Sequence, residues 1–322
     1  MPRKILLTGA TGFVGRHVRA ALMETSADIL CGSRNPEGAA KRYPEASWCR
    51  VDVNDVETLH TSLQECDAAI YLIHSMGSAD DYAAEERRAA ARFADACVEA
   101  GVERVVYLGG VAPAGEPSVH LASRIETGRM LRERCPGVVE LRAAMVIGAG
   151  SESWRICRDL AVRLPLMVLP KWLQTLSYPV AIEDVVAAIV HAALAEAPDV
   201  AGCYDLPGPE CLSAEQILRR IAHLRGIEPV TIPVPVLSPS LSSYWLKLVS
   251  GANYDVAREL VQGLTEDLIP TCPVYWDRMD AHRLTSFDEA ASRALDDEEE
   301  LPVSTRWLEK AIRGIARRYR EA

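Results

Sequence analysis

Three glycines near the N-terminus stand at a spacing that suits the binding of a phosphate group. Gly9, Gly12 and Gly15 occur in the stretch TGATGFVG, residues 8–15. Gly9 permits a tight turn, Gly12 lets the backbone approach a pyrophosphate, and Gly15 lets the next helix lie close on the strand. The apolar stretch KILL precedes the turn, and residues 16–23 follow it with apolar side chains at helical spacing. A strand, a glycine turn and a helix in this order predict a dinucleotide-binding site.

The N-terminus of the helix after this turn is expected to add contacts to the phosphates. Unpaired N–H groups and the positive end of the helix dipole attract anions there. We therefore expect Thr11, Phe13 and Val14 to line the pyrophosphate together with the three glycines. The alternative is a purely structural glycine turn.

The end of the second expected strand bears on which dinucleotide binds. An acid about 20 residues beyond the glycine turn would bind the ribose hydroxyls of NAD, whereas an arginine accommodates the 2′-phosphate of NADP. Here Ser33 and Arg34 stand in that place, and no acid does. A planar guanidinium suits bidentate binding of phosphate, so Arg34 favours NADP(H) over NAD(H). Alternatively Arg34 is a solvated loop residue, as we expect of Lys41 and Arg42.

The spacing of the glycines, with Thr8 in front, resembles that of the extended and atypical short-chain dehydrogenase/reductase (SDR) superfamily. Four further stretches resemble its atypical, NAD(P)-binding epimerase/dehydratase-like members, which include the nitrogen-metabolite-regulator-like group: YLIHSM (71–76), YLGG (107–110), LRAAMVIG (141–148) and YDLPGPE (204–210). The resemblance covers most of the chain. It implies the fold and the cofactor and leaves the substrate open, because this group mixes enzymes with non-catalytic binders.

The resemblance also implies cofactor contacts at three further strand ends. In this superfamily an aspartate at the end of the third strand binds the adenine amino group, and Asp52 takes that place. The other contacts that we expect are Val53, Leu72, Ile73, His74, Leu108, Gly109 and Gly110. His74 could equally be a structural histidine.

The catalytic residues of ordinary SDR enzymes are replaced in this chain. Those enzymes use a serine or threonine at the end of the fifth strand and a YxxxK pair on the next helix. The lysine, one helical turn from the tyrosine, lowers the pKa of the phenol so that it can exchange a proton. Here glycines end the fifth strand, and His120 and Arg124 stand at the YxxxK spacing.

Two hypotheses follow from this replacement. His120 could be the general acid or base, since imidazole titrates near neutral pH, and Arg124 could bind the nicotinamide ribose. Alternatively the site does no SDR chemistry, and the chain binds NADP(H) as a sensor or a structural ligand. We expect no metal site.

The elements that must position these residues alternate along the chain. Strands are expected at residues 4–7, 28–32, 48–51, 68–73, 104–108 and 138–142, separated by helices that include 56–63, 80–100 and 121–135. This alternation predicts an α/β fold with a Rossmann-type, doubly wound parallel sheet. We place the NAD(P)-binding domain at residues 1–200 and a smaller, mainly helical C-terminal region at 201–322, on the substrate side.

Composition narrows the classes of partner. The 322 residues carry a net charge of −10, which argues against a nucleic-acid partner. Nine cysteines without a CxxC pair suggest reduced thiols and a cytoplasmic protein. There is no apolar run long enough to span a membrane and no room for a signal peptide before the first strand. A basic amphipathic helix at 303–320 could contact a membrane surface or dock on its own domain.

The sequence therefore predicts an NADPH-dependent oxidoreductase without the usual triad, acting on a small, fairly apolar carbonyl or enone. Hydride transfer requires a positioned cofactor and a donor that stabilises the electrophile, so loss of the tyrosine does not forbid it. A cofactor-binding regulator or assembly factor without turnover is the alternative. Neither the substrate nor the oligomeric state follows from the sequence.

Overall fold

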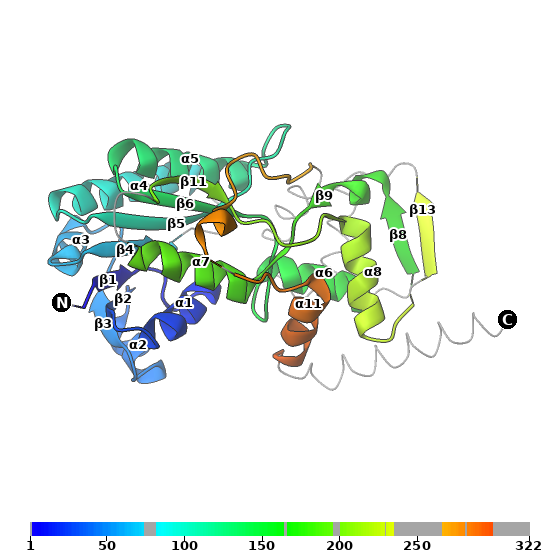
Figure 1. Ribbon diagram of the computed structural model, residues 1–322, viewed down its shortest axis with the longest axis horizontal. Helices are drawn as coiled ribbons and strands as arrows, with labels where there is room; N and C mark the ends of the chain where they lie inside the picture. The colour runs from blue at the N-terminus through cyan, green and yellow to red at the C-terminus, as the bar shows by residue number, and fades with distance from the viewer. Residues whose placement is uncertain are drawn as a thin grey trace.

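A computed structural model describes residues 2–73, 82–163, 166–195, 200–228, 230–234, 266–280 and 282–298. Its centre is a seven-stranded sheet (Figure 1). The strands are β1 (Lys4–Leu7), β2 (Asp28–Ser33), β3 (Ser47–Arg50), β4 (Ala68–Tyr71), β5 (Arg104–Gly110), β6 (Val138–Ala143) and β11 (Gly202–Asp205). They lie in the order β11-β6-β5-β4-β1-β2-β3, and every pairing is parallel.

The chain winds outward from β1 in both directions, which makes the sheet doubly wound. Ile5 of β1 pairs with Ile29 of β2 on one side and with Ala68 of β4 on the other. β4 is buried along its whole length, as expected for a parallel strand covered on both faces. The predicted fold class is confirmed.

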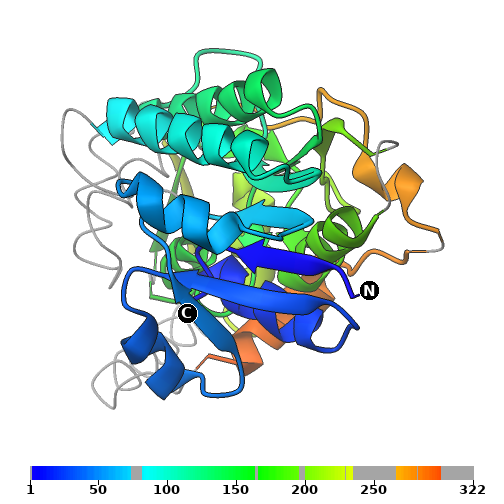
Figure 2. The same cartoon turned by 90° about the vertical axis from the view of Figure 1, so that its left-hand side faces the viewer.

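Helices cover both faces of this sheet (Figure 2). α1 (Phe13–Met23) and α7 (Ile182–Leu194) pack on one face, with α2 (Pro36–Arg42) beside β3. α3 (Val56–Leu63), α4 (Tyr82–Glu99) and α5 (Val119–Arg134) pack on the other face. α1 begins three residues before the helix expected from sequence, because Gly12 is its N-cap.

A second hydrophobic core lies beside the sheet, around Trp154 and Phe287. It joins α6 (Glu152–Arg163), α8 (Ala214–Leu224) and α11 (Phe287–Asp296), which Figure 1 shows on the right. Short strands pair here: β7 (Val146–Ile147) with β10 (Val180–Ala181), β8 (Leu166–Pro170) with β13 (Val230–Val234), and β9 (Leu176–Ser177) with β12 (Leu212–Ser213). Two 3-10 helices, η1 (Lys171–Gln174) and η2 (Tyr275–Arg278), complete the described elements.

The division at residue 200 stays a prediction. The sheet itself extends past that residue, because β11 pairs with β6. The helix expected at 303–320 lies outside the described residues. Within the described residues, the model contains no helix that is both long enough and apolar enough to cross a membrane.

Thr8 joins the carboxyl ends of β1 and β4. Its backbone N–H and its hydroxyl both donate to the carbonyl oxygen of Ile70, at 3.0 and 2.9 Å. The same hydroxyl accepts from the N–H of Leu72 at 3.2 Å. Thr8 is fully buried, so these bonds have no competition from water. They fix the loops that follow β1 and β4 relative to each other.

We predict that Thr8→Val, which is nearly isosteric, lowers the free energy of unfolding by about 1–3 kcal/mol, because the Leu72 N–H loses its acceptor in a buried place. Urea denaturation measures this value. The matched control is Thr11→Val in the same turn, where the side chain is exposed. Equal stability of the two variants would contradict the role given to the Thr8 hydroxyl.

Candidate cofactor-binding site

The glycine turn after β1 is packed too tightly for any other residue at two of its positions. Gly9 has φ +66°, and a Cβ there would lie 2.7 Å from the carbonyl oxygen of Leu72. A Cβ at Gly15 would overlap the carbonyl oxygen of Gly9 and lie 2.9 Å from Cα of Ala10. Gly15 therefore lets α1 lie close to the glycine turn. The close approach that we expected between this helix and the strand is made to the turn instead.

Gly12 faces open space instead. A Cβ there would meet a single atom within 4 Å, the carbonyl oxygen of Gly9 at 3.2 Å. Gly12 is exposed and its N–H donates to Gly9 at 2.9 Å. It is the N-cap of α1 and carries no side chain over the helix end. The first N–H groups of α1 thus point where an anion can approach. Thr11 is exposed beside them, and Phe13 and Val14 are half-buried.

The end of β2 presents an arginine next to this turn. Ser33 is the last residue of β2, and its hydroxyl accepts from the N–H of Asn35 at 3.1 Å. Asn35 in turn caps α2 by accepting from Gly38 at 3.0 Å. Arg34 lies between them, exposed, and forms no ion pair with the residues that the structure describes. A 2′-phosphate on a ribose bound here would find a guanidinium without a competing carboxylate.

A second exposed arginine, Arg50, ends the neighbouring strand β3. It pairs with Ser33 across the sheet. Sequence reasoning missed Arg50. The register of β2 against β3 would have identified it, but that register depends on contacts between strands and not on local sequence.

The ends of β3 and β4 contribute groups that are already engaged. The Asp52 carboxylate accepts from the N–H of Asn54 at 3.0 Å. Val53 and Ile73 are half-buried, and Leu72 touches the glycine turn as described. The adenine role of Asp52 stays a prediction, and His74 lies outside the described residues. Asp55 is the N-cap of α3 but makes no side-chain bond to the helix. Its backbone carbonyl instead accepts from the Thr58 hydroxyl at 2.7 Å.

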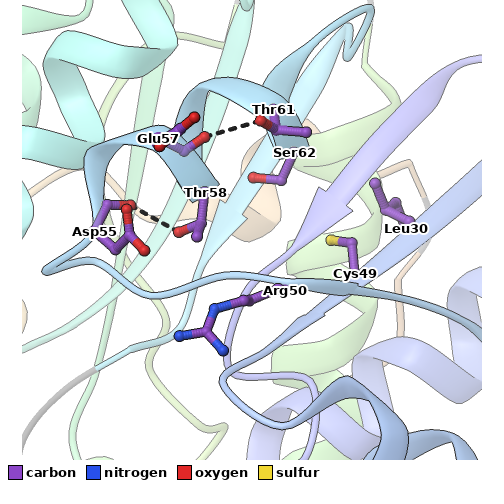
Figure 3. A pocket seen from close by; sticks show the side chains of 8 residues that line it. All are labelled: Leu30, Cys49, Arg50, Asp55, Glu57, Thr58, Thr61 and Ser62. Atoms are coloured by element: carbon purple, nitrogen blue, oxygen red, sulfur yellow. Dashed lines mark hydrogen bonds between the residues drawn. The ribbon is translucent and has the colours of Figure 1, made fainter.

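A pocket of about 440 Å³ lies on the other face of the sheet from α1 (Figure 3). Its lining residues are Leu30, Cys49, Arg50, Asp55, Glu57, Thr58, Thr61 and Ser62. The hydroxyls of Thr58 and Thr61 donate to carbonyl oxygens of Asp55 and Glu57 at 2.7 and 2.9 Å. Because these hydroxyls serve the backbone around α3, we assign this pocket no part in binding the cofactor.

At the end of β5, other residues occupy the space that a side chain at Gly109 or Gly110 would need. A Cβ at Gly110 would lie 2.5 Å from Cδ1 of Leu121, and one at Gly109 would lie 3.3 Å from Oε1 of Glu140. Glu140 is fully buried and pairs with Arg142 at 2.8 Å and with Arg132. A hydroxyl residue in place of either glycine would therefore displace its neighbours. Leu108 is half-buried beside them.

His120 and Arg124 lie on the first turns of α5, which begins after the N-cap Ser118. Both are half-buried. Burial, together with the nearby charge of Arg124, lowers the pKa of His120 to about 4. The imidazole is therefore neutral near pH 7. This corrects the premise that it titrates near neutrality, although a neutral imidazole still has one N–H to donate.

Arg124 has a polar atom that the described protein leaves unsatisfied. Its Cδ lies near Gly110, where a Cβ would be 3.9 Å away. Its Nε is buried and has no hydrogen-bond partner among the described residues. The hydroxyl of Tyr107 donates to the Arg124 carbonyl oxygen at 3.0 Å and so ties α5 to β5. A buried donor without an acceptor suits a ribose hydroxyl, so the residues present fit a dinucleotide.

The part of the chain that carries these features matches the model of a known protein family. Residues 5–134 match the NAD dependent epimerase/dehydratase family. The resemblance to the SDR superfamily is confirmed by this match together with the fold of the solved relatives. The matched residues contain the glycine turn, Arg34, Asp52, His120 and Arg124.

Two solved structures share the fold of nearly the whole chain. Triphenylmethane reductase of Citrobacter sp., in complex with NADP(H), has a TM-score of 0.70 at 18% identity, covering 90% of this chain and 99% of that one. A nucleoside-diphosphate-sugar epimerase of Staphylococcus aureus has a TM-score of 0.72 at 15% identity, with coverages of 90% and 99%.

A curated relative matches in sequence over a shorter length. Auxiliary protein GraX of Staphylococcus aureus (strain NCTC 8325 / PS 47) is 24% identical over 152 residues, which are 45% of this chain and 49% of that protein. The chain spans about half or less of the length of the curated relatives it matches.

We predict that Gly15→Ala and Gly12→Ala separate packing from binding. Gly15→Ala should lower the free energy of unfolding by about 1–3 kcal/mol, because the added methyl overlaps the Gly9 carbonyl. Gly12→Ala should keep the fold and weaken NADPH binding by roughly tenfold, because the methyl projects toward the phosphates. Chemical denaturation and calorimetric titration measure the two effects. Loss of stability in both variants, with binding spared in the folded fraction of Gly12→Ala, would contradict the assignment.

We also predict that His120 titrates near pH 4 in an NMR pH titration. Since this folded-state pKa lies below the ordinary value, the stability that His120 contributes is fully present above about pH 6.5 and is lost as the pH falls toward 4. Arg124→Gln should raise the pKa of His120, whereas Arg129→Gln, an exposed change on the same helix, should not. A midpoint near the ordinary value in the unaltered protein would disprove the burial argument.

Proposed function

We propose that this chain binds NADP(H) and reduces a small, fairly apolar carbonyl or enone by hydride transfer. The observation that carries the cofactor choice is Arg34, exposed at the end of β2 beside the glycine turn. An arginine in this place accommodates a 2′-phosphate, because a planar guanidinium suits bidentate binding of phosphate.

Each part of the site would have its own task. The N–H groups at the start of α1 would bind the pyrophosphate, Arg34 the 2′-phosphate, and Nε of Arg124 a hydroxyl of the nicotinamide ribose. When bound, NADPH supplies the hydride. The neutral imidazole of His120 would donate a hydrogen bond to the substrate oxygen and so stabilise the charge that develops there. In this role His120 polarises the carbonyl, and the proton that completes the reduction would come from water.

Reduction is supported by the solved relative in complex with NADP(H), which is named a triphenylmethane reductase. That name describes the other protein. For this chain we propose only the chemical class of the substrate. We further propose that the chain acts in the cytoplasm.

A second candidate is a non-catalytic NADP(H) binder that acts as a regulator, a sensor or an assembly factor. Two observations favour it. The space for a hydroxyl at the end of β5 is filled by Leu121, and the low pKa of His120 leaves no imidazolium near neutral pH. The curated relative is named an auxiliary protein, which agrees with a role without turnover.

Oxidation of NADPH across a panel of carbonyls and quinones separates the two candidates. Reduction of at least one substrate, lost in His120→Ala and retained in Arg129→Ala, would support an oxidoreductase. Tight NADPH binding without turnover of any member of the panel would favour the non-catalytic binder. Turnover that is unchanged in His120→Ala would remove His120 from the site.

We predict that Arg34→Ala weakens binding of NADPH by about tenfold to a hundredfold, the cost of losing a charged hydrogen bond to the 2′-phosphate. Binding of NADH should change little, because that cofactor lacks the phosphate. Lys41→Ala, an exposed change in the neighbouring α2, is the matched control. Calorimetric titration of each protein with NADPH and with NADH measures these affinities. Equal losses for both cofactors in Arg34→Ala would refute the 2′-phosphate assignment.

A further inference from the structure

Two cysteines that are distant in sequence meet at the edge of the sheet. Cys203 lies on β11, the outermost strand, and Cys272 lies on the C-terminal segment 266–280, drawn in orange in Figure 1. Their Sγ atoms are 3.1 Å apart, although 69 residues separate them. Both are half-buried and neither is in a disulfide. In the described part of the chain, no other two cysteine sulfurs are bonded in this way.

The backbone holds this pair in place independently of the sulfurs. Oδ2 of Asp205, two residues beyond Cys203, accepts from the N–H groups of Thr271 and Cys272, both at 2.6 Å. The N–H of Asp205 donates to the carbonyl oxygen of Pro273 at 3.0 Å. Asp205 also forms a parallel bridge with Val274. The segment therefore lies along β11 in a fixed register, and the two thiols do not meet by chance side-chain rotation.

The surroundings distinguish the two sulfurs. Burial, together with the hydrogen bond to Cys272, raises the pKa of Cys203 to about 12, so Cys203 stays a thiol near neutral pH and can donate to Cys272. Nη1 of Arg142 also donates to Sγ of Cys272, at 3.6 Å. Cys272 thus accepts from two donors, one of them cationic. The direct contact with a guanidinium favours Cys272 over Cys203 as the sulfur that attacks first.

We propose that Cys203 and Cys272 are a redox-active pair. They form a reversible disulfide with each other by exchange with a low-molecular-weight disulfide of the glutathione type. The sulfur of Cys272, having lost its proton, attacks the small disulfide, forms a mixed disulfide and releases one small thiolate. Cys203 then loses its proton and attacks Sγ of Cys272, which releases the second. The two protons pass to the two small thiolates. Two protein thiols are oxidised to one disulfide, and one small disulfide is reduced to two thiols.

The disulfide would fix a segment that runs between β9 and the loop after β11. On one side of Cys272, the N–H of Leu268 donates to the carbonyl oxygen of Leu176 at 2.8 Å. On the other side, Nε1 of Trp276 donates to the carbonyl oxygen of Pro207 at 2.7 Å. Oxidation would therefore anchor the middle of this segment to β11. The proposal does not depend on cofactor binding.

The test equilibrates the full-length protein with glutathione buffers of increasing oxidised fraction, alkylates the remaining thiols and maps peptides without reduction. The expected product joins the peptides of Cys203 and Cys272, is lighter by two hydrogens, and disappears on reduction. Hydrogen exchange at the N–H groups of Thr271 and Cys272 should slow in the oxidised protein. Cys211→Ser, which removes an exposed cysteine, should leave the cross-link intact.

Two variants test the order of attack. Cys203→Ser should accumulate a mixed disulfide with glutathione on Cys272, whereas Cys272→Ser should leave Cys203 a thiol. The reverse pattern would overturn the assignment of Cys272 as the attacking sulfur. If Cys203 and Cys272 stay unlinked under buffers that glutathionylate the exposed Cys211, the proposal of a redox pair is wrong.

Discussion

The rest of the site depends on two close contacts at Gly9, one with Leu72 and one with Gly15. These contacts fix the position of the glycine turn and of α1. Leu72, after β4, leaves no room for a side chain at Gly9, and Gly9 leaves none at Gly15 in α1. The hydroxyl of Thr8 fixes the same two strand ends through three short hydrogen bonds with Ile70 and Leu72. The N-terminus of α1 is therefore fixed relative to β4, and Gly12 leaves it open on the side where we propose that the pyrophosphate binds.

A second close contact places the other end of the site. Glycines at the end of β5 let α5 approach, so that Leu121 and Arg124 cover the strand where SDR enzymes carry a hydroxyl residue. Beneath Gly109, the buried Glu140 pairs with Arg142 and Arg132. Removing one partner of such a buried pair leaves an uncompensated charge. The same packing places Arg124 near the end of β5, where we propose that it binds a ribose, and leaves little room there for the usual catalytic hydroxyl. Arg142 in turn contacts Cys272.

Local sequence was sufficient to predict the elements whose pattern is local. α3 has the predicted bounds, Val56–Leu63. The capping box of α8 is likewise local, because Ser213 and Gln216, three residues apart, form it. Features that depend on contacts between distant segments could not be predicted in this way. The pairing of Arg50 with Ser33 requires a strand register, and the low pKa of His120 requires knowledge of its burial. The contact of Cys203 with Cys272 joins residues 69 positions apart, and no periodicity indicates it.

The most direct test of the central claim is a calorimetric titration of the intact protein with NADPH and, separately, with NADH at one ionic strength. The account predicts a clear preference for NADPH, because the exposed Arg34 binds the 2′-phosphate while the glycine turn binds the pyrophosphate common to both. Equal affinity would contradict the role of Arg34. If neither cofactor binds, the glycine turn is structural or serves another ligand, and the proposed oxidoreductase is excluded.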